Sequence, residues 1–252
     1  MKKSHVLILV VLGVLILDQA LKIYVKTSFS YGGGFKILGQ DWAQILFIEN
    51  PGMAFGITFG DKCLGSTADD GSCNGIKITE DTGKLLLSLF RILMVAFLIY
   101  FIRELHRAKE SMGLLISLSL ILAGAIGNIL DSMFYGLIFN EPLYHEGIAE
   151  FMSEDRGYAP FLFGRVVDMF YFPMIDTRLP EWLPLWGGNR FQFFRPIFNL
   201  ADASISVGVA SIILFHRSFL KNSSTDKKSK EASSSELPPA TEASQTSGLP
   251  ES

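Results

Sequence analysis

The sequence predicts an all-α membrane protein with four transmembrane helices, and three observations support this. Hydrophobic residues make up 49% of the 252 residues. Only 19% of the residues are charged. Four separate windows are apolar over the roughly 20 residues that a helix needs to cross about 30 Å of hydrocarbon. This composition is typical of a multi-pass membrane protein rather than of a soluble domain.

The predicted helices cover residues 5–25, 85–102, 112–135 and 196–215, within a membrane domain of residues 1–221. Lys2 and Lys3 before an apolar run could also begin a cleaved signal peptide. No small-residue cleavage site follows and the apolar run resumes after Asp18, so we expect the first helix to be retained. Residues 222–252 are rich in Ser, Thr, Glu, Lys and Pro, which predicts a disordered cytoplasmic tail.

The placement of Lys and Arg predicts the orientation, because cytoplasmic loops carry an excess of these residues. They precede the first helix, fill the link between the second and third, and follow the fourth. With four spans these segments share one side, so both termini would be cytoplasmic. The loops 26–84 and 136–195 would then face outward.

The outward loops differ in composition. In the first, residues 42–48 predict a short strand, residues 53–59 a second extended run, and residues 61–83 a polar surface excursion. Cys63 and Cys73 lie in this excursion and could form a disulfide or remain free thiols. The second loop is rich in aromatic residues and prolines, as in a membrane-interface belt or a small packed subdomain.

Several kinds of site are not expected. The 4 histidines are scattered and no zinc-binding motif occurs, so we predict no metal. The net charge is −3 and no basic stripe with interleaved aromatic residues is present, so nucleic acid is not an expected partner. No glycine-rich phosphate loop precedes a helix, and we therefore expect no soluble cofactor.

Four carboxylates are predicted at one depth, in the outer leaflet. Asp18 would lie about 12 Å below the outer end of the first helix, at 1.5 Å per residue. Asp131 and Asp202 lie near the outer ends of the third and fourth helices, and Asp168 lies in the loop before the fourth. Because an ionised Asp costs about 2.5–3.5 kcal/mol near the bilayer centre, an Asp in such a segment is a functional candidate.

Two of these carboxylates have simple structural interpretations. Asp18 precedes Lys22 by four residues, which places both on one helix face and favours an ion pair. A positioning role is therefore preferred for Asp18 over direct catalysis. Asp168 could similarly form an ion pair with Arg165.

The other two share an N-x-x-D spacing. Asn128 and Asp131 lie on one helix face, and Asn199 and Asp202 repeat the arrangement. The small residues at 123–127 would let another helix approach closely, which favours a supporting role for Asp131 over a catalytic one. If the last helix starts at residue 196, Asp202 lies too deep to cap it.

A pair of neighbouring carboxylates suits peptide hydrolysis. Two carboxylates held close cannot both ionise easily, so one keeps a proton. The charged one can activate water, and the protonated one can protonate the leaving nitrogen. Serine, cysteine and zinc mechanisms lack their residues here. We therefore predict that Asp168 and Asp202 form a catalytic dyad at the outer membrane face.

Five segments carry a resemblance to a known family. They are Asp18-Gln19-Ala20-Leu21-Lys22, Asn50-Pro51-Gly52-Met53-Ala54-Phe55-Gly56, Gly127-Asn128-Ile129-Leu130-Asp131, Val166-Val167-Asp168 and Phe198-Asn199-Leu200-Ala201-Asp202. In this order and on four helices, they resemble the lipoprotein signal peptidases (type II signal peptidases). The resemblance covers most of residues 6–216.

The resemblance implies a fold and a function. The fold would be four transmembrane helices with a small extracytoplasmic β-rich cradle, in the bacterial cytoplasmic (inner) membrane. The enzyme would cleave a diacylglyceryl-modified prolipoprotein just before its lipidated cysteine, with the active site facing the periplasmic side. The implied partners are the lipid-modified prolipoprotein and membrane lipid, and we expect a monomer.

The family's catalytic pair corresponds to Asp168 and Asp202. The residues that we predict to bind substrate or support the dyad are Asp18, Lys22, Asn50, Gly52, Asn128, Asp131, Arg165 and Asn199.

The sequence departs from the family pattern in three places. Ser132 stands where the family usually has Arg after the helix-three Asp, and Arg165 could take over part of that role. Residues 137–164 form an inserted loop where the family usually has a short link. Residues 61–83 and the tail after residue 222 are additions on which the resemblance is silent.

The main alternative is a small proton-coupled transporter that uses intramembrane carboxylates. A proton relay should place ionisable groups through the full membrane depth, often in repeated halves. Here the carboxylates share one level, no repeat is visible, and the second helix is expected to contribute no interior charge. A purely structural scaffold would leave the costly carboxylates without a purpose. The peptidase is therefore preferred.

Overall fold

The computed structural model describes residues 3–50, 62–67, 73–78, 80–141, 147–152, 157–178, 180–182, 188–193 and 196–217. The chain divides into two compact units, Met1–Ser211 and Ile212–Ser252, and the elements below lie in the first unit apart from the end of the last helix. The predicted extended run 53–59 and the predicted disordered tail lie outside the described residues, so both stay predictions.

Three described helices are long and apolar enough to cross a membrane. They are α1 (Lys3–Ser28), α2 (Glu80–Arg107) and α3 (Met112–Leu130). A π-helical turn, η3 (Asp131–Tyr135), extends α3 into the short α4 (Gly136–Ile138). These helices contain the first three predicted windows.

The fourth window begins later than predicted. The helix α5 covers Leu200–Phe215, 16 residues, or about 24 Å, and is shorter than the three other apolar helices. Ile197–Phe198 instead form the strand β8, which pairs with β5 (Val166–Tyr171). Pro196 lacks an N–H and two bulky apolar residues follow it, a combination that suits the start of an edge strand.

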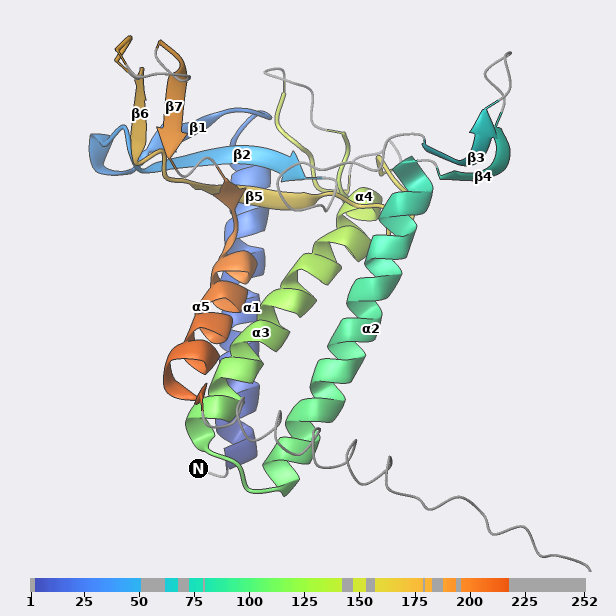
Figure 1. Cartoon of the computed structure of the whole chain (residues 1–252), viewed down its shortest axis with the longest axis vertical. Helices are drawn as coiled ribbons and strands as arrows, with labels where there is room; N and C mark the ends of the chain where they lie inside the picture. Colours follow the sequence, from blue (N-terminus) through green and yellow to red (C-terminus); the bar gives the residue numbers. More distant parts are fainter. Residues whose placement is uncertain are drawn as a thin grey trace, which may run out of the picture. The chain divides into compact units, whose positions relative to one another are not determined.

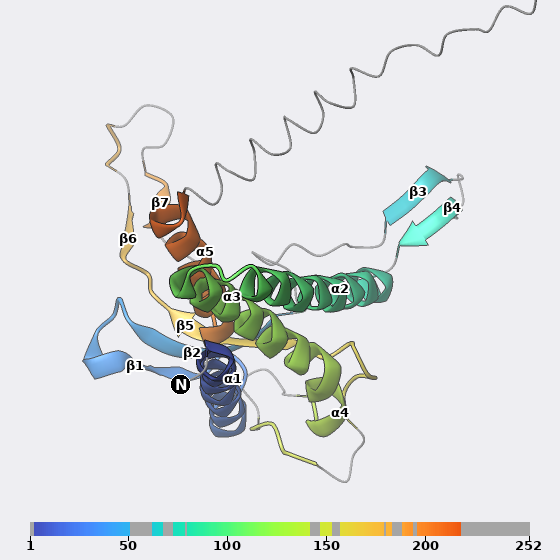
Figure 2. The same cartoon turned by 90° about the horizontal axis from the view of Figure 1, so that it is seen from below.

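The helices pack through small residues. α3 contacts both α1 and α2, as the two perpendicular views show (Figures 1 and 2). A Cβ atom at Gly124 would lie 2.2 Å from the carbonyl oxygen of Ala201, so α3 and α5 approach each other backbone to backbone. Gly127 likewise leaves room for the Asp18 carboxylate. The close approach predicted from residues 123–127 is therefore present.

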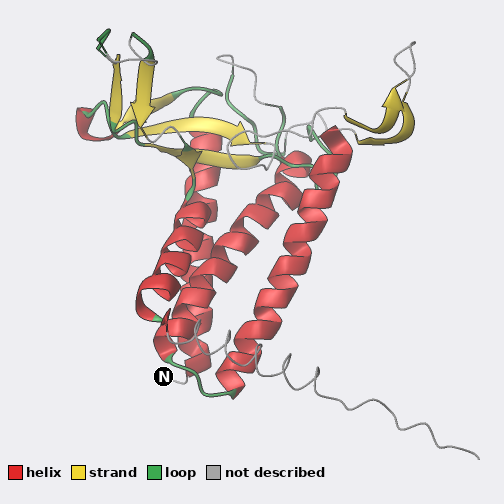
Figure 3. Ribbon diagram, viewed as in Figure 1, coloured by secondary structure: helices red, strands yellow, loops and turns green. Residues whose placement is uncertain are grey.

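A four-stranded antiparallel sheet lies at the end of α1 opposite its N-terminus (Figures 1 and 3). Its order is β1 (Gly34–Lys36), β2 (Gln44–Asn50), β5 and β8. A single 3₁₀ turn, η1 (Ile37–Gly39), joins β1 to the loop before β2. The strand predicted at 42–48 is β2, two residues later in the chain. α1 contacts both β2 and β5, which fixes the sheet on the helices.

Two separate hairpins complete the described elements. β3 (Lys62–Thr67) pairs with β4 (Cys73–Ile78), and β6 (Ile175–Arg178) pairs with β7 (Arg190–Phe193). The stretch 61–83, predicted to be a polar excursion, thus contains a hairpin and the first turn of α2. The described side chains do not include those of the two cysteines, so the disulfide stays a prediction.

The hydrophobic core lies between the sheet and the ends of α1 and α3. Phe47, Val167 and Met169 enter it from β2 and β5, and Tyr135 and Phe139 enter from the end of the α3–α4 segment. Because side chains alternate along a strand, Val167 and Met169 on one face leave Asp168 on the other. The core thereby fixes which way the Asp168 carboxylate points.

Candidate active site

Asp168 is held by two amides. Its side chain is buried, and its two oxygens accept hydrogen bonds from Asn50 Nδ2 at 3.2 Å and from Asn199 Nδ2 at 2.7 Å. Asn50 ends β2, which pairs with β5, whereas Asn199 follows β8. The sheet therefore brings both amides to one carboxylate.

Asp202 lies in the first turn of α5, in a capping box with Asn199. Asn199 Oδ1 accepts from the Asp202 N–H at 2.9 Å, and Asp202 Oδ2 accepts from the Asn199 N–H at 3.4 Å. This reciprocal pair satisfies backbone donors that a helix start leaves unbonded. The expectation that Asp202 lies too deep to be part of a cap was wrong, because α5 starts at residue 200.

Two asparagines join the carboxylates into one network. Asn199 Nδ2, which binds Asp168, also donates to Asn128 Oδ1 at 3.1 Å. Asn128 Nδ2 then donates to Asp202 Oδ1 at 2.7 Å. The structure thus brings Asp168 and Asp202 into one hydrogen-bonded cluster through the two N-x-x-D pairs of the sequence.

The two carboxylates have different surroundings. Burial, followed by the negative charge of Asp202, raises the pKa of Asp168 to about 7. The hydrogen bonds from Asn50 and Asn199 and the charge of Lys22 act in the opposite direction. Asp202 is only partly buried. Near neutral pH, Asp168 can therefore hold the single proton that a carboxylate pair shares.

Lys22 is the centre of a buried ion-pair group below the dyad. Its Nζ lies 2.8 Å from Asp18 Oδ2, 2.7 Å from Asp131 Oδ2 and 3.1 Å from Asn128 Oδ1. The pairing of Asp18 with Lys22 was predicted from their spacing and is present. Asp18 also accepts from the Ala201 N–H at 2.9 Å, so it ties α1 to the start of α5.

Asp131 supports both the helices and the sheet. Besides Lys22, it accepts from Gln19 Nε2 at 2.9 Å and from the Val167 N–H at 3.4 Å. Gln19 was not predicted as a site residue, although it lies inside the Asp18–Lys22 motif. Tyr135 donates to Gln19 Oε1 at 3.1 Å and orients it. Asp131 therefore has the supporting geometry that its sequence position suggested.

Arg165 belongs to an ion-pair cluster that does not include Asp168. Its guanidinium pairs with Glu49 at 3.4 Å and with Glu141 at 2.9 Å, rather than with Asp168. Glu49 is also paired with the buried Lys26, whose ammonium lies over the rings of Phe47, Phe139 and Tyr158. Sequence reasoning missed this Lys26–Glu49 pair. Gly52, another predicted site residue, lies outside the described residues.

Arg91 is a further residue that sequence reasoning missed. It lies within α2 and its Nη1 is 3.4 Å from Ser132 Oγ. Its charge interacts with those of Asp202, Asp131 and Asp168. The second helix therefore does contribute an interior charge, contrary to expectation.

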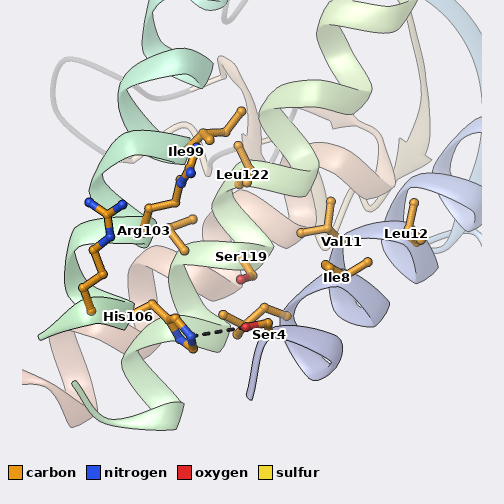
Figure 4. A pocket seen from close by; sticks show the side chains of 12 residues that line it. Ser4, Ile8, Val11, Leu12, Ile99, Arg103, His106, Ser119 and Leu122 are labelled. Atoms are coloured by element: carbon orange, nitrogen blue, oxygen red, sulfur yellow. Dashed lines mark hydrogen bonds between the residues drawn. The ribbon is translucent and has the colours of Figure 1, made fainter. Parts of the chain in front are cut away.

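The part of the chain that the structure describes contains no group of three or more His, Cys, Asp or Glu side chains that could hold a metal. A groove of about 460 Å³ between α1, α2 and α3 is lined mainly by apolar residues, with a hydrogen bond between Ser4 and His106 at 3.2 Å (Figure 4). It includes none of the predicted site residues. The candidate site is the dyad.

The fold and the site together define a membrane-embedded protein with a paired-carboxylate centre. Comparison with known proteins identifies its family. Residues 10–218 match the family model for signal peptidase (SPase) II. The chain belongs to this family.

Relatives share most of their length with this chain. A lipoprotein signal peptidase of Porphyromonas gingivalis is 44% identical over 201 residues, which cover 79% of this chain and 77% of that protein. A lipoprotein signal peptidase of Amoebophilus asiaticus is 35% identical over 225 residues, or 88% of this chain and 82% of that protein. The similarity therefore covers the helices and the sheet that build the site.

A solved structure supports the fold. It is a bacterial membrane enzyme determined by the in meso method at 1.9 Å resolution, with a TM-score of 0.50 and 23% identity. The match covers 83% of this chain and 91% of that one. The chain is thus a multi-pass membrane protein, as its apolar helices also indicate.

Proposed function

We propose that this protein is an intramembrane aspartyl endopeptidase that removes signal peptides from diacylglyceryl-modified prolipoproteins, cleaving just before the lipidated cysteine. The observation that carries the proposal is the hydrogen-bonded bridge from Asp168 through Asn199 and Asn128 to Asp202. Membership of the signal peptidase II family supports the substrate class.

The dyad can supply both halves of peptide hydrolysis. The ionised carboxylate takes a proton from water while the water oxygen bonds to the carbonyl carbon of the scissile peptide. The C–N bond then breaks as a proton passes from the dyad to the amide nitrogen, releasing a free amine and a carboxyl group. The partly buried Asp202 and the protonated Asp168 fit the roles of base and acid, respectively.

The surrounding residues would keep this pair in place. Asn50, Asn128 and Asn199 orient the carboxylates, whereas Asp18, Lys22 and Asp131 hold α1, α3 and α5 together beneath them. Arg165 and Gly52 stay predicted substrate-binding or supporting residues.

The remaining proposals concern the membrane. α5 would act as a fourth, short span, with both termini cytoplasmic and the sheet and dyad on the periplasmic side of the inner membrane. Substrate would enter from the lipid, and the enzyme would act as a monomer. A proton-coupled transporter is not favoured, because the family and the clustered dyad both point to hydrolysis.

The test is processing of a lipid-modified precursor in membranes that contain Asp168→Asn or Asp202→Asn. Asn keeps the side-chain shape but cannot exchange the proton, so we expect uncleaved precursor to accumulate at normal enzyme levels. Asp41→Asn, at an exposed loop carboxylate paired with Lys36, is the matched control and should process normally. Normal processing by either dyad variant would remove that residue from the mechanism.

A further inference from the structure

Arg91 is a charged residue inside a membrane-crossing helix. It lies within the apolar stretch Thr82–Arg107, away from both ends, and is half-buried. An Arg near the centre of a transmembrane helix costs about 2.5–3.5 kcal/mol on insertion scales, and such residues face partners in the protein interior. Arg91 follows this rule, because it reaches Ser132 in η3.

The groups around Arg91 are those of the dyad. Its charge interacts with those of Asp202 from α5, Asp131 from η3 and Asp168 from β5. The other cation in the cluster is Lys22 from α1, which is already paired with Asp18 and Asp131. Lys22 therefore forms its ion pairs with the supporting carboxylates, although its charge also acts on Asp168. Arg91 approaches the same cluster from α2, where it contacts Ser132, whose hydroxyl donates to the carbonyl of Asn128.

The charges in the cluster show what Arg91 contributes. Asp18, Asp131, Asp168 and Asp202 would carry four negative charges if all were ionised, and Lys22 together with one shared proton offsets two. Arg91 offsets a third. Without it, the uncompensated negative charge would oppose any further negative charge that develops on the substrate carbonyl during attack.

The position of Arg91 also accounts for a departure in the sequence. The family usually has Arg directly after the helix-three Asp, where this chain has Ser132. The Ser132 hydroxyl lies 3.4 Å from the Arg91 guanidinium, so the two positions are adjacent in space. Arg165, the residue first considered as a replacement, is paired with Glu49 and Glu141 instead.

We propose that Arg91 is a positioning residue of the dyad, which supplies from α2 the positive charge that is usually supplied from α3. From there it offsets the negative charge that develops during attack on the lipopeptide carbonyl. This inference rests on the proposed function.

The test measures kcat and KM of the full-length enzyme on a synthetic diacylglyceryl lipopeptide, from about pH 5 to 9, beside the thermal midpoint. Removing an electrostatic group of this kind typically lowers kcat about 100- to 1,000-fold. We expect that loss for Arg91→Gln, mainly in kcat rather than in KM. Arg91→Lys should lose less. Arg103→Gln, near the C-terminal end of α2, is the matched control.

Relocation of the charge makes the test specific. In the double variant Arg91→Gln/Ser132→Arg the cation moves to the adjacent position in η3, so kcat should return to within about tenfold of that of the unsubstituted enzyme. A purely structural Arg91 would not be rescued in this way. The inference is overturned if Arg91→Gln retains full activity, or if the folded double variant is no more active than Arg91→Gln.

Failure of this inference is distinguishable from failure of the proposed function. The same assay includes the unsubstituted enzyme and Asp168→Asn. If the unsubstituted enzyme does not cleave the lipopeptide, the proposed function fails. If it does, and only Asp168→Asn is inactive while Arg91→Gln is not, the role of Arg91 alone is rejected.

Discussion

At the residue scale, Asn199 combines three roles. One side chain caps α5, binds Asp168 and contacts Asn128. Its oxygen performs the first role and its NH₂ group the other two. A substitution that keeps an oxygen acceptor but removes the NH₂ group should therefore preserve the helix cap and remove the hydrogen bonds to Asp168 and Asn128.

We predict that Asn199→Ser keeps the cap, because Ser is a good N-cap residue, but lowers processing at least about 100-fold. Asn199→Ala should lose the same activity and, in addition, about 1 kcal/mol of stability. Lipopeptide cleavage and the thermal midpoint of the purified protein check both parts. Equal activity of the Ser variant and the unsubstituted enzyme would show that the NH₂ contacts do not matter.

The titration of Asp168 gives a pH prediction. Its pKa is raised to about 7 from an ordinary value of 3.8. The proton that the dyad needs is present below about pH 7 and is lost as pH rises through it. We expect kcat to fall on the alkaline side with a midpoint near 7, measured with the lipopeptide. A flat profile up to pH 9 would contradict this assignment.

The same shift affects stability with a definite sign. The folded state binds this proton more tightly than the unfolded state, so the contribution of Asp168 to stability decreases as pH rises from about 4 to 7. Asp168→Asn, which cannot ionise, should therefore gain in thermal midpoint relative to the unsubstituted enzyme over this range. A constant difference between the two would show that Asp168 titrates normally.

At the element scale, the contact between α3 and α5 determines whether Asn128 and Asp202 meet. The absence of a side chain at Gly124 allows the Ala201 carbonyl to lie where a Cβ would be. Helix association in lipid depends on such close packing, because lipid supplies no hydrophobic driving force between helices.

We predict that Gly124→Ala pushes α5 away from α3 and lowers both stability and processing. Overpacking of this kind typically costs about 1–3 kcal/mol. Gly13→Ala is the matched control, since a Cβ at Gly13 in α1 would meet nothing within 4 Å. Thermal midpoints and cleavage rates measured side by side test the prediction, and equal losses in the two variants would refute it.

At the scale of the whole molecule, the proposed orientation places the sheet and the link between α2 and α3 on opposite sides of the membrane. Chemical labelling can distinguish these two sides. Leu38, in η1 beside the sheet, and Lys109, between α2 and α3, are both exposed. In a background with Cys63→Ser and Cys73→Ser, a membrane-impermeant maleimide should label Leu38→Cys in spheroplasts. Lys109→Cys should be labelled only after lysis. The reverse pattern would place the dyad on the cytoplasmic side.

The inserted loop is partly integrated into the fold. Of its described residues, Ala149 is in the core and Phe151 pairs with Phe139. The hydroxyl oxygen of Tyr158 accepts a hydrogen bond from the Arg165 N–H at 2.7 Å. Burial, followed by the charge of Glu49, raises the pKa of the Tyr158 hydroxyl, which therefore stays protonated. The insertion thus supports the strand that carries Asp168.

Local sequence spacing was enough for part of this structure. Apolar windows predicted the helices, and the four-residue step from Asp18 to Lys22 predicted their ion pair, because both depend only on the geometry of one helix. The repeated N-x-x-D spacing indicated a cluster and the small residues indicated close helix packing. The dyad itself also rested on resemblance to a family.

Contacts between distant segments required the tertiary structure. Strand pairing of residues 197–198 with β5 moved the start of α5 and placed Asp202 in a capping box, which no local pattern indicated. The partners of Arg165, the Lys26–Glu49 pair and the approach of Arg91 to the dyad join residues from different elements, so their energies depend on how those elements pack. The sequence by itself determined which segments are apolar and which carboxylates must be compensated, since insertion in lipid penalises isolated charge. Only the packing of helices and sheet decided which cation pairs with which carboxylate.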